Sequence, residues 1–136
     1  VDLTTDNFGG ETSWEIVDEC LGTVIGTGDN FTSNGNFIQT VCATAGSQWT
    51  FTIFDSFGDG ICCGFGTGSY TVTLDGVPVV TSDQFNNPFT GSNQSTTFGA
   101  PVCPPCFGST ISIDLTTDSF GGETTWELID VTNGNN

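Results

Sequence analysis

The chain contains no lysine, arginine or histidine, yet it carries 16 aspartates and glutamates, so its formal net charge at pH 7 is −16. Binding to nucleic acid is excluded because phosphate contacts need cationic side chains. Anionic membrane surfaces are excluded for the same reason, and no apolar run is long enough to insert into a membrane. The missing histidine and lysine also remove the usual general bases and Schiff-base nucleophiles. We therefore expect a protein that is not an enzyme.

Charge compensation has to come from outside the chain. Sixteen like charges oppose compaction, and bound divalent cations are the simplest remedy. Paired carboxylates can also hydrolyse glycosides, but such a site needs an acid and a base with separated pKa values. Here the carboxylates lie in glycine-rich turn sequences, so glycoside hydrolysis ranks third among the functional hypotheses.

Cysteine usage bears on the compartment. Six cysteines in a chain without lysine favour an oxidising environment. The sequence shows no signal peptide or lipidation motif, and it begins at Val1 and not at methionine. We expect an extracellular protein, a mature or excised segment of a longer secreted product.

The beginning of the chain recurs near its end. Residues 1–18 (VDLTTDNFGGETSWEIVD) and 113–130 (IDLTTDSFGGETTWELID) are identical at 13 of 18 positions, and the other five are conservative replacements. A fixed-period repeat is typical of tandem arrays, and two strands alone are marginally stable in water. The sequence therefore predicts one complete unit and the opening of a second, which something outside 113–136 must complete.

Short runs rich in β-branched and aromatic residues, bounded by Gly, Asn and Asp, predict an all-β fold. Asp75-Gly76 predicts a two-residue hairpin turn, Pro78 predicts an edge strand, and the aromatic run 48–54 predicts a central one. The expected strands are Val1–Thr5, Thr12–Asp18, Thr23–Gly28, Phe37–Thr44, Gln48–Phe54, Gly68–Leu74, Val77–Asp83 and Ser95–Phe98, with Ile111–Thr116 and Thr124–Asp130 in the repeat.

A weaker duplication lies inside the first unit. Residues 6–11 (DNFGGE) resemble 55–60 (DSFGDG), and a hairpin and a closing aromatic residue, Phe31 or Phe85, follow each. We expect each half to form one sheet. Two such sheets packed face to face give an antiparallel β-sandwich or jelly roll made of two related halves. We assign residues 1–99 to this module, 100–110 to a connector rich in Pro and Cys, and 111–136 to the start of the next repeat or to a donated strand segment.

The acidic loops are the candidate metal sites. Glycine lets backbone carbonyls turn toward a common point, and clustered carboxylates without a basic partner suit a hard cation such as Ca²⁺. The alternative is an Asx turn, in which each aspartate caps its own loop. The candidate ligands are Asp6, Glu11, Asp55 and Asp59, with Asp118 and Glu123 in the repeat. Other aspartates are expected to be solvated, namely Asp2, Asp18, Asp29 and Asp83.

A disulfide framework is expected from Cys20, Cys42, Cys62, Cys63, Cys103 and Cys106. Because a bond between neighbouring residues is unusual, we expect Cys62 and Cys63 each to pair elsewhere, with Cys42 and Cys103 as partners. Cys20 corresponds to Thr132 in the repeat, so its bridge is not part of the repeated design. Zinc bound by Cys103 and Cys106 is the alternative.

The aromatic residues can fill the core or form a sugar-stacking platform; the group is Trp14, Trp49, Tyr70, Trp126, Phe8 and Phe57. Core packing is favoured because aromatic side chains dominate small β cores. Asn30-Phe31-Thr32 and Asn93-Gln94-Ser95 are acceptor sequences for N-glycosylation. We therefore expect glycans at Asn30 and Asn93.

The motifs DNFGGETSW at residues 6–14 and DSFGDGICC at residues 55–63 carry a resemblance. Over roughly residues 1–98 the chain resembles a tandem β-sandwich repeat module of large secreted bacterial surface proteins, with the motifs D-x-[FY]-G-x-E-T-[ST]-W and D-S-[FY]-G-D-G-x-C-C. The resemblance implies a secreted β-sandwich with a non-catalytic role in adhesion, display or assembly.

The leading hypothesis is a structural subunit of an extracellular filament. Its copies join head to tail through residues 113–136, which open the next unit or dock as a donated strand, and calcium stiffens the joints. The alternative is a calcium-dependent adhesion or carbohydrate-binding module of a secreted surface protein.

Overall fold

The computed structural model describes residues 1–101, 103, 113–125 and 127. The chain divides into two compact units, Val1–Pro105 and Cys106–Asn136, which we describe separately. Among the described residues, all strands belong to the first unit, and the second contributes the 3-10 turn η2 (Gly121–Glu123). The predicted strands Ile111–Thr116 and Thr124–Asp130 lie partly outside the described residues, and the described part of each is not in a strand.

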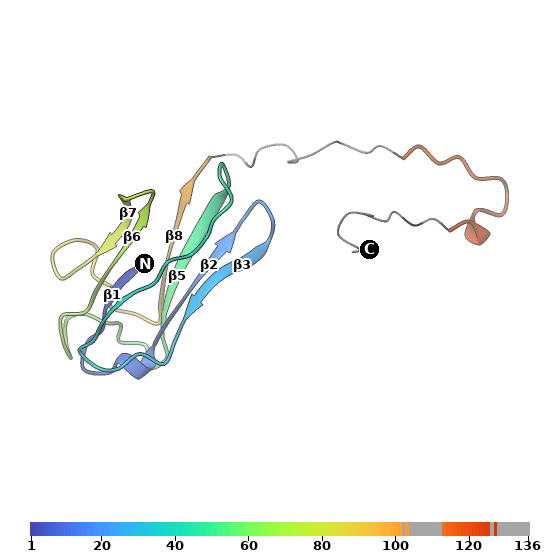
Figure 1. Ribbon diagram of the computed structural model, residues 1–136. Coiled ribbons are helices and arrows are strands. Elements are labelled where there is room, and N and C mark those ends of the chain that lie inside the picture. The colour runs from blue at the N-terminus through green and yellow to red at the C-terminus, as the bar shows by residue number, and fades with distance from the viewer. Residues whose placement is uncertain (102, 104–112, 126, 128–136) are drawn as a thin grey trace. The chain divides into compact units, whose positions relative to one another are not determined.

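The first unit is an antiparallel β-sandwich of two four-stranded sheets (Figure 1), so the predicted all-β fold is confirmed. The strand orders are β4-β1-β6-β7 and β3-β2-β5-β8. The elements are β1 (Asp2–Thr4), η1 (Gly9–Glu11), β2 (Thr12–Asp18), β3 (Thr23–Gly28), β4 (Asn36–Ile38), β5 (Gln48–Asp55), β6 (Ser69–Leu74), β7 (Val77–Ser82) and β8 (Asn93–Gly99).

Alternation of inward and outward side chains builds the core. Along β5, Trp49, Phe51 and Ile53 are buried, and the residues between them are partly exposed, as expected where successive side chains point to opposite faces of a strand. The rings of Phe51 and Tyr70 come from opposite sheets and have centroids 5.1 Å apart. Aromatic packing therefore links the two layers, and the predicted central position of β5 is confirmed.

Exchanging the first four strands with the last four leaves the topology unchanged. If β1 to β4 trade places with β5 to β8, the order β4-β1-β6-β7 becomes β8-β5-β2-β3, which is the second sheet. Both hairpins also have a register shift at the matching place, between Ile16 and Val17 and between Val72 and Thr73. The prediction that each half forms one sheet is wrong, because each acidic loop carries the chain from one sheet to the other.

Two further expectations are corrected at the chain crossings. The strand predicted at Phe37–Thr44 ends at Ile38, because the chain must leave the first sheet to reach the start of β5 in the second. Phe85 does not close the core: it is 83% exposed, and Phe89 is buried in its place. The reason is the turn after β7, in which Asp83 Oδ1 accepts the backbone N–H groups of Phe85 and Asn86 and thereby leaves Phe85 outside.

The predicted hairpin between β6 and β7 is confirmed. Asp75 and Gly76 both have positive φ, 51° and 83°, as the primed two-residue turn requires. Pro78 lies in β7, which is an edge strand of its sheet, where a missing N–H costs no ladder hydrogen bond.

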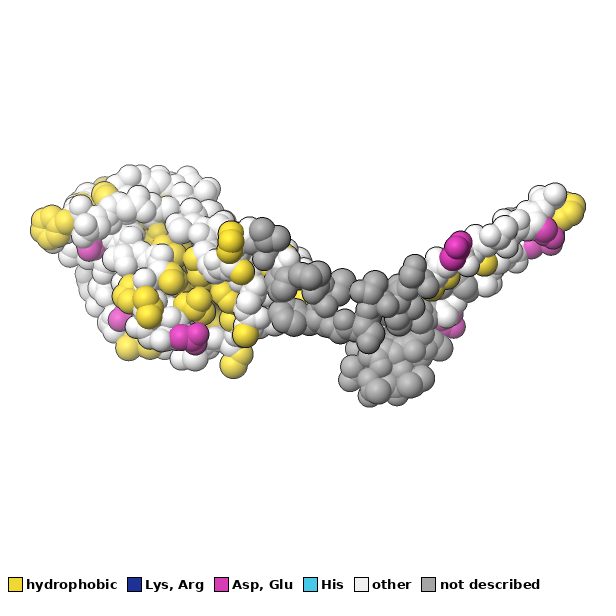
Figure 2. All heavy atoms as spheres, turned by 90° about the horizontal axis from the view of Figure 1, so that it is seen from above, with side chains coloured by type: hydrophobic (Ala, Val, Ile, Leu, Met, Phe, Trp, Pro, Cys, Tyr) yellow, Lys and Arg dark blue, Asp and Glu magenta, His cyan; other side chains and the backbone are white. Residues whose placement is uncertain are grey.

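The two ends of the sandwich differ. The loops 5–11 and 56–68 meet at one end, which we call the acidic end, where Ser56 N–H donates to Glu11 O at 3.0 Å. At the other end, the start of β1, the loop 39–47 and the end of β8 surround a cavity of about 640 Å³. Figure 2 views this cavity end and shows hydrophobic side chains gathered in its hollow. The lining includes Val1, Ile25, Val41, Trp49, Leu74 and Phe98.

Neighbouring glycines in η1 provide a matched test of this packing. A Cβ at Gly9 would collide with the backbone carbonyl of Thr32, whereas a Cβ at Gly10 would meet no atom within 4 Å. We predict that Gly9→Ala lowers the free energy of unfolding by about 1–3 kcal/mol, and that Gly10→Ala changes it by less than about 0.5 kcal/mol. Urea titration of both variants measures the difference, and equal stabilities would contradict the packing described.

Candidate functional site

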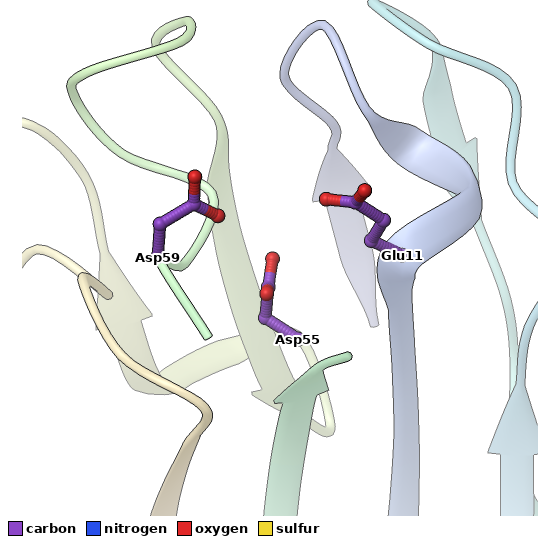
Figure 3. Close-up of side chains that lie close together, drawn as sticks. All are labelled: Glu11, Asp55 and Asp59. Carbon is purple, nitrogen blue, oxygen red and sulfur yellow. The ribbon is translucent and has the colours of Figure 1, made fainter. Parts of the chain in front are cut away.

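Three carboxylates converge at the acidic end of the sandwich. Glu11 ends η1, Asp55 ends β5, and Asp59 lies in the loop that follows β5. One carboxylate oxygen from each lies within 4.8 Å of the other two, and Figure 3 shows the side chains pointing toward a common space. We call these three residues the carboxylate cluster. The sequence assigns them to two separate loops, and the fold brings those loops together.

Backbone hydrogen bonds hold Glu11 and Asp55 close together. The Glu11 N–H donates to Phe8 O at 2.9 Å and closes η1, while Glu11 O accepts from Ser56 N–H. In the sheet, Asp55 pairs with Thr12, the residue that follows Glu11. Glu11 and Asp55 therefore cannot separate without breaking the pairing of β2 with β5.

The Asx-turn alternative is confirmed for both loops. Asp6 Oδ1 accepts the Phe8 N–H at 2.8 Å, and Asp55 Oδ1 accepts the Gly58 N–H. Asp6 is buried and lies outside the cluster of three. Turn capping leaves the cluster intact, so a calcium site built from Glu11, Asp55 and Asp59, with Asp6 close by, stays a prediction.

Electrostatic repulsion is concentrated at the cluster. Partial burial raises the pKa of Glu11 above its ordinary value of 4.5, and the carboxylates of Asp55, Asp59 and Asp6 raise it further. The chain has no basic side chain to neutralise them. A set of oxygen ligands around a shared space is what Ca²⁺ or Mg²⁺ takes, so this arrangement can hold a hard divalent cation.

One side chain that the sequence does not single out borders the cluster. Thr12 is 1% exposed, pairs with Asp55 across the sheet and is buried on the same face. Its Oγ1 has no hydrogen-bond partner, which is costly for a buried hydroxyl. Nothing in the sequence separates this threonine from the others in alternating strands.

The repeat reproduces the first acidic loop in its local structure. The Phe120 N–H donates to Asp118 Oδ1 at 2.8 Å, and the Glu123 N–H donates to Phe120 O at 2.9 Å. The distances match those of Asp6 and Glu11 in the first copy. Asp118 and Glu123 are exposed, and η2 forms without the two sheets, so the turn is encoded by these residues alone.

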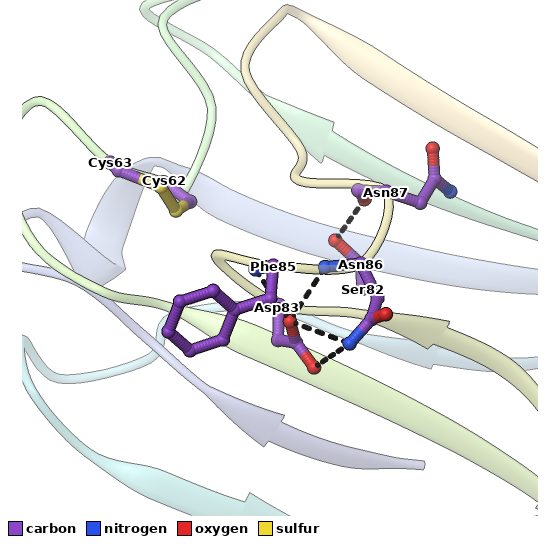
Figure 4. Close-up of a disulfide and its surroundings, with 7 residues drawn as sticks. All are labelled: Cys62, Cys63, Ser82, Asp83, Phe85, Asn86 and Asn87. Atoms are coloured by element: carbon purple, nitrogen blue, oxygen red, sulfur yellow. Dashed lines mark hydrogen bonds between the residues drawn. A yellow bond between two sulfur atoms is a disulfide. The ribbon is translucent and has the colours of Figure 1, made fainter.

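The disulfides differ from the prediction. Cys62 bonds to Cys63, and Cys20 bonds to Cys103 (Figure 4 shows the first bond). Cys42 has a free thiol and lies in the loop at the cavity end, with β5 between it and the loop of Cys62. A disulfide needs Cα atoms within about 7 Å, so the predicted bond from that loop to Cys42 is wrong.

The predicted partner of the same loop, Cys103, is taken by Cys20, and the zinc alternative loses that ligand as well. Cys106 lies outside the described residues.

One aspartate expected to be solvated is fully buried. Asp18 is 0% exposed, and its Oδ1 accepts the N–H groups of Cys20 and Leu21 at 2.9 and 3.1 Å. Asp83 is partly exposed and is held by its own turn (Figure 4), where hydrogen bonds from the Asn86 side chain and from the Phe85 and Asn86 backbone lower its pKa. Both carboxylates thus stabilise the turns that follow β2 and β7.

Aromatic residues divide between the core and the acidic end. Core packing is confirmed for Trp14, Trp49 and Tyr70, which are buried. Trp126 lies outside the described residues. Phe8 and Phe57 are exposed, and so is Phe65, whose ring packs edge to face on Phe8 with centroids 5.7 Å apart. The predicted glycan acceptors, Asn30 and Asn93, are both exposed.

No family model, curated protein or solved structure matches this chain. The resemblance to bacterial surface modules therefore stays a prediction. Among the described residues, no helix is both long and apolar enough to span a membrane. The two disulfides indicate a compartment outside the reducing cytoplasm.

The raised pKa of Glu11 gives a pH test. A proton on Glu11 stabilises the fold at low pH, and this contribution is lost as the pH rises past 4.5 through the folded-state pKa. In metal-free buffer we predict that Glu11→Gln is more stable than the wild type at pH 7 but not at pH 4. Millimolar Ca²⁺ at pH 7 reverses the order, because the wild type keeps a ligand that the variant lacks. Thermal unfolding under the three conditions measures this, and a variant less stable than the wild type in metal-free buffer at pH 7 contradicts it.

Proposed function

We propose that this protein is a structural subunit of an extracellular filament, joined head to tail through residues 113–136 and stabilised by calcium. The observation that carries the proposal is the repetition of residues 1–18, which form β1, η1 and β2, in a segment where the described side chains of Ile113 and Leu115 are exposed. Leu115 is 52% exposed, whereas its counterpart Leu3 is 1% exposed. An apolar segment of this kind gains free energy when it is covered by another sandwich.

Calcium has a specific role in this proposal. The net charge of −16 makes copies of the chain repel one another, and the three carboxylates of the cluster repel one another within each copy. A divalent cation at Glu11, Asp55 and Asp59 offsets both effects. It also ties the loop after β1 to the loop after β5, and so stiffens the acidic end.

An extracellular setting agrees with the surface of the sandwich. The two disulfides fit an oxidising compartment, and the acceptor residues Asn30 and Asn93 are accessible to glycosylation. The chain has no lysine or arginine, so proteases that cut after those residues find no site. These properties suit a polymer that persists outside the cell.

A second candidate function is a calcium-dependent adhesion or carbohydrate-binding module. The exposed rings of Phe8, Phe57 and Phe65 favour it, because they belong to the same two loops as the carboxylate cluster. Aromatic rings stack on sugar faces, and a bound cation can take sugar hydroxyls as ligands. A glycan array with and without a chelator separates the two functions: calcium-dependent glycan binding without polymers supports the module.

Calcium dependence gives a direct test of the filament proposal. We predict that Ca²⁺ raises the unfolding temperature of the purified chain and promotes filaments visible by electron microscopy, and that a chelator reverses both effects. Asp59→Asn removes the calcium response because one of three carboxylates is lost. Asp75→Asn is the matched control: Asp75 is exposed in the β6–β7 turn, at the opposite end, with a φ that Asn tolerates. Filaments that form equally well in a chelator, or an Asp59→Asn variant that responds like Asp75→Asn, contradict calcium at this cluster.

A further inference from the structure

The inner positions of residues 1–18, which we call the opening segment, are preserved in residues 113–130, which we call the copy segment. Seven of the buried positions are identical between the two, and the eighth exchanges Ile16 for Leu128. The buried residues of the opening segment are Leu3, Thr5, Asp6, Gly9, Thr12, Trp14, Ile16 and Asp18. The other four differences fall at exposed or partly exposed positions: Val1, Asn7, Ser13 and Val17. Apart from the exchange of Ile16 for Leu128, the copy segment therefore has the same residues that the sandwich buries in its opening segment.

The place that such a segment can occupy is set by the topology. In the sandwich, β1 lies between β4 and β6, and β2 lies between β3 and β5. Both strands are central, and the segment crosses from one sheet to the other between them. A strand added at a sheet edge would bury the inner side chains of only one of the two strands. Both sets are covered together only where the opening segment itself lies.

The disulfide between Cys20 and Cys103 marks the boundary of the opening segment. It closes residues 20–103 into one covalent loop, and the opening segment lies just outside that loop. This segment can therefore leave the sandwich while the other six strands stay tied together. The copy segment has Thr132 at the position of Cys20, so it forms no competing bridge.

The described part of the copy segment also has local structure and exposure that fit this position. Its turn η2 already has the hydrogen bonds of η1, and its Leu115, whose counterpart Leu3 is buried in the sandwich, is exposed. The connector from Cys103, where the disulfide holds the chain, to residue 113 can span about 35 Å when extended, which is longer than the eight residues of β5 at about 3.3 Å each. A segment attached through this connector can reach the sandwich of a second molecule.

We infer that the copy segment of one molecule replaces the opening segment in the sandwich of a second copy of this chain. This rests on the proposed function and specifies its joint. The exchange places Glu123 of the donor where Glu11 lies, beside Asp55 and Asp59 of the recipient. The carboxylate cluster at each joint then takes residues from two molecules, so a cation bound there fastens one molecule to the next.

Matched substitutions at Leu3 and Leu115 test the exchange in the full-length chain. Leu115→Asp is expected to leave the monomer's unfolding temperature unchanged and to weaken self-association by about 100-fold or more, because it would bury a charge in the recipient's core. Leu3→Asp is expected to fold only in oligomers, where a donor replaces its defective segment. The double variant is expected to stay unfolded. Ser119→Asp, at a position whose counterpart Asn7 is exposed, is the control and should associate like the wild type.

Light scattering over a concentration series and thermal unfolding measure these outcomes. A Leu115→Asp chain that associates like the wild type, or a Leu3→Asp chain that folds as a monomer, overturns the exchange and leaves the filament proposal standing. A wild type that stays monomeric with calcium overturns both.

Substitutions of Glu11 and Glu123 distinguish replacement of the opening segment from addition of the copy segment at a sheet edge. If the copy segment replaces the opening segment, the calcium dependence of the assembled form is lost in Glu123→Gln and kept in Glu11→Gln. In the monomer the order is reversed, because Glu11 then completes the cluster. Assembled Glu123→Gln that keeps its calcium response rejects the exchange.

Discussion

The constraint on which this structure depends is that its carboxylates have no basic side chain to pair with. No ion pair between side chains is possible in the chain, so the buried acids use backbone N–H donors instead. Asp6, Asp18 and Asp55 each accept such bonds from the turn that follows, and in this way the acids become the residues that shape the loops. These hydrogen bonds do not neutralise the negative charge, which is concentrated where Glu11, Asp55 and Asp59 meet. At neutral pH, a cation from solution can compensate this charge.

The matching topology of the two halves explains why the negative charge gathers at one end of the sandwich. Each acidic loop carries the chain between the sheets, and because the two halves are related by the same topology, both crossings lie at the same end. The cluster is thus a result of duplicating a unit that has an acidic loop. The opposite end holds the cavity, the start of β1 and the end of β8, where the chain enters and leaves the sandwich. In the proposed exchange, assembly and ion binding are connected because the opening segment supplies Glu11 to the cluster.

Local patterns in the sequence were sufficient to predict most of the fold. The alternation in β2 and β6, the Asp75-Gly76 turn and the edge position of Pro78 depend on neighbouring residues, and all were predicted. The errors concern contacts that depend on the assembled sandwich. Burial of Asp18, the replacement of Phe85 by Phe89 in the core and the pairing of Cys20 with Cys103 follow from which loops share an end. Three of the four predicted ligands in the first unit form the cluster, whereas the buried, unpartnered hydroxyl of Thr12 could not be predicted from its residue type.

The bond between Cys20 and Cys103 also decides how the sandwich responds to tension. A pull applied between Val1 and the connector beyond residue 103 passes through this bond and bypasses the enclosed loop, whose ends are 83 residues apart in the sequence. The strands inside the loop bear no load along the chain. Only residues 1–19 can be drawn out, which limits the extension of each unit to about 65 Å. Under such a pull, the greater part of the core would stay folded.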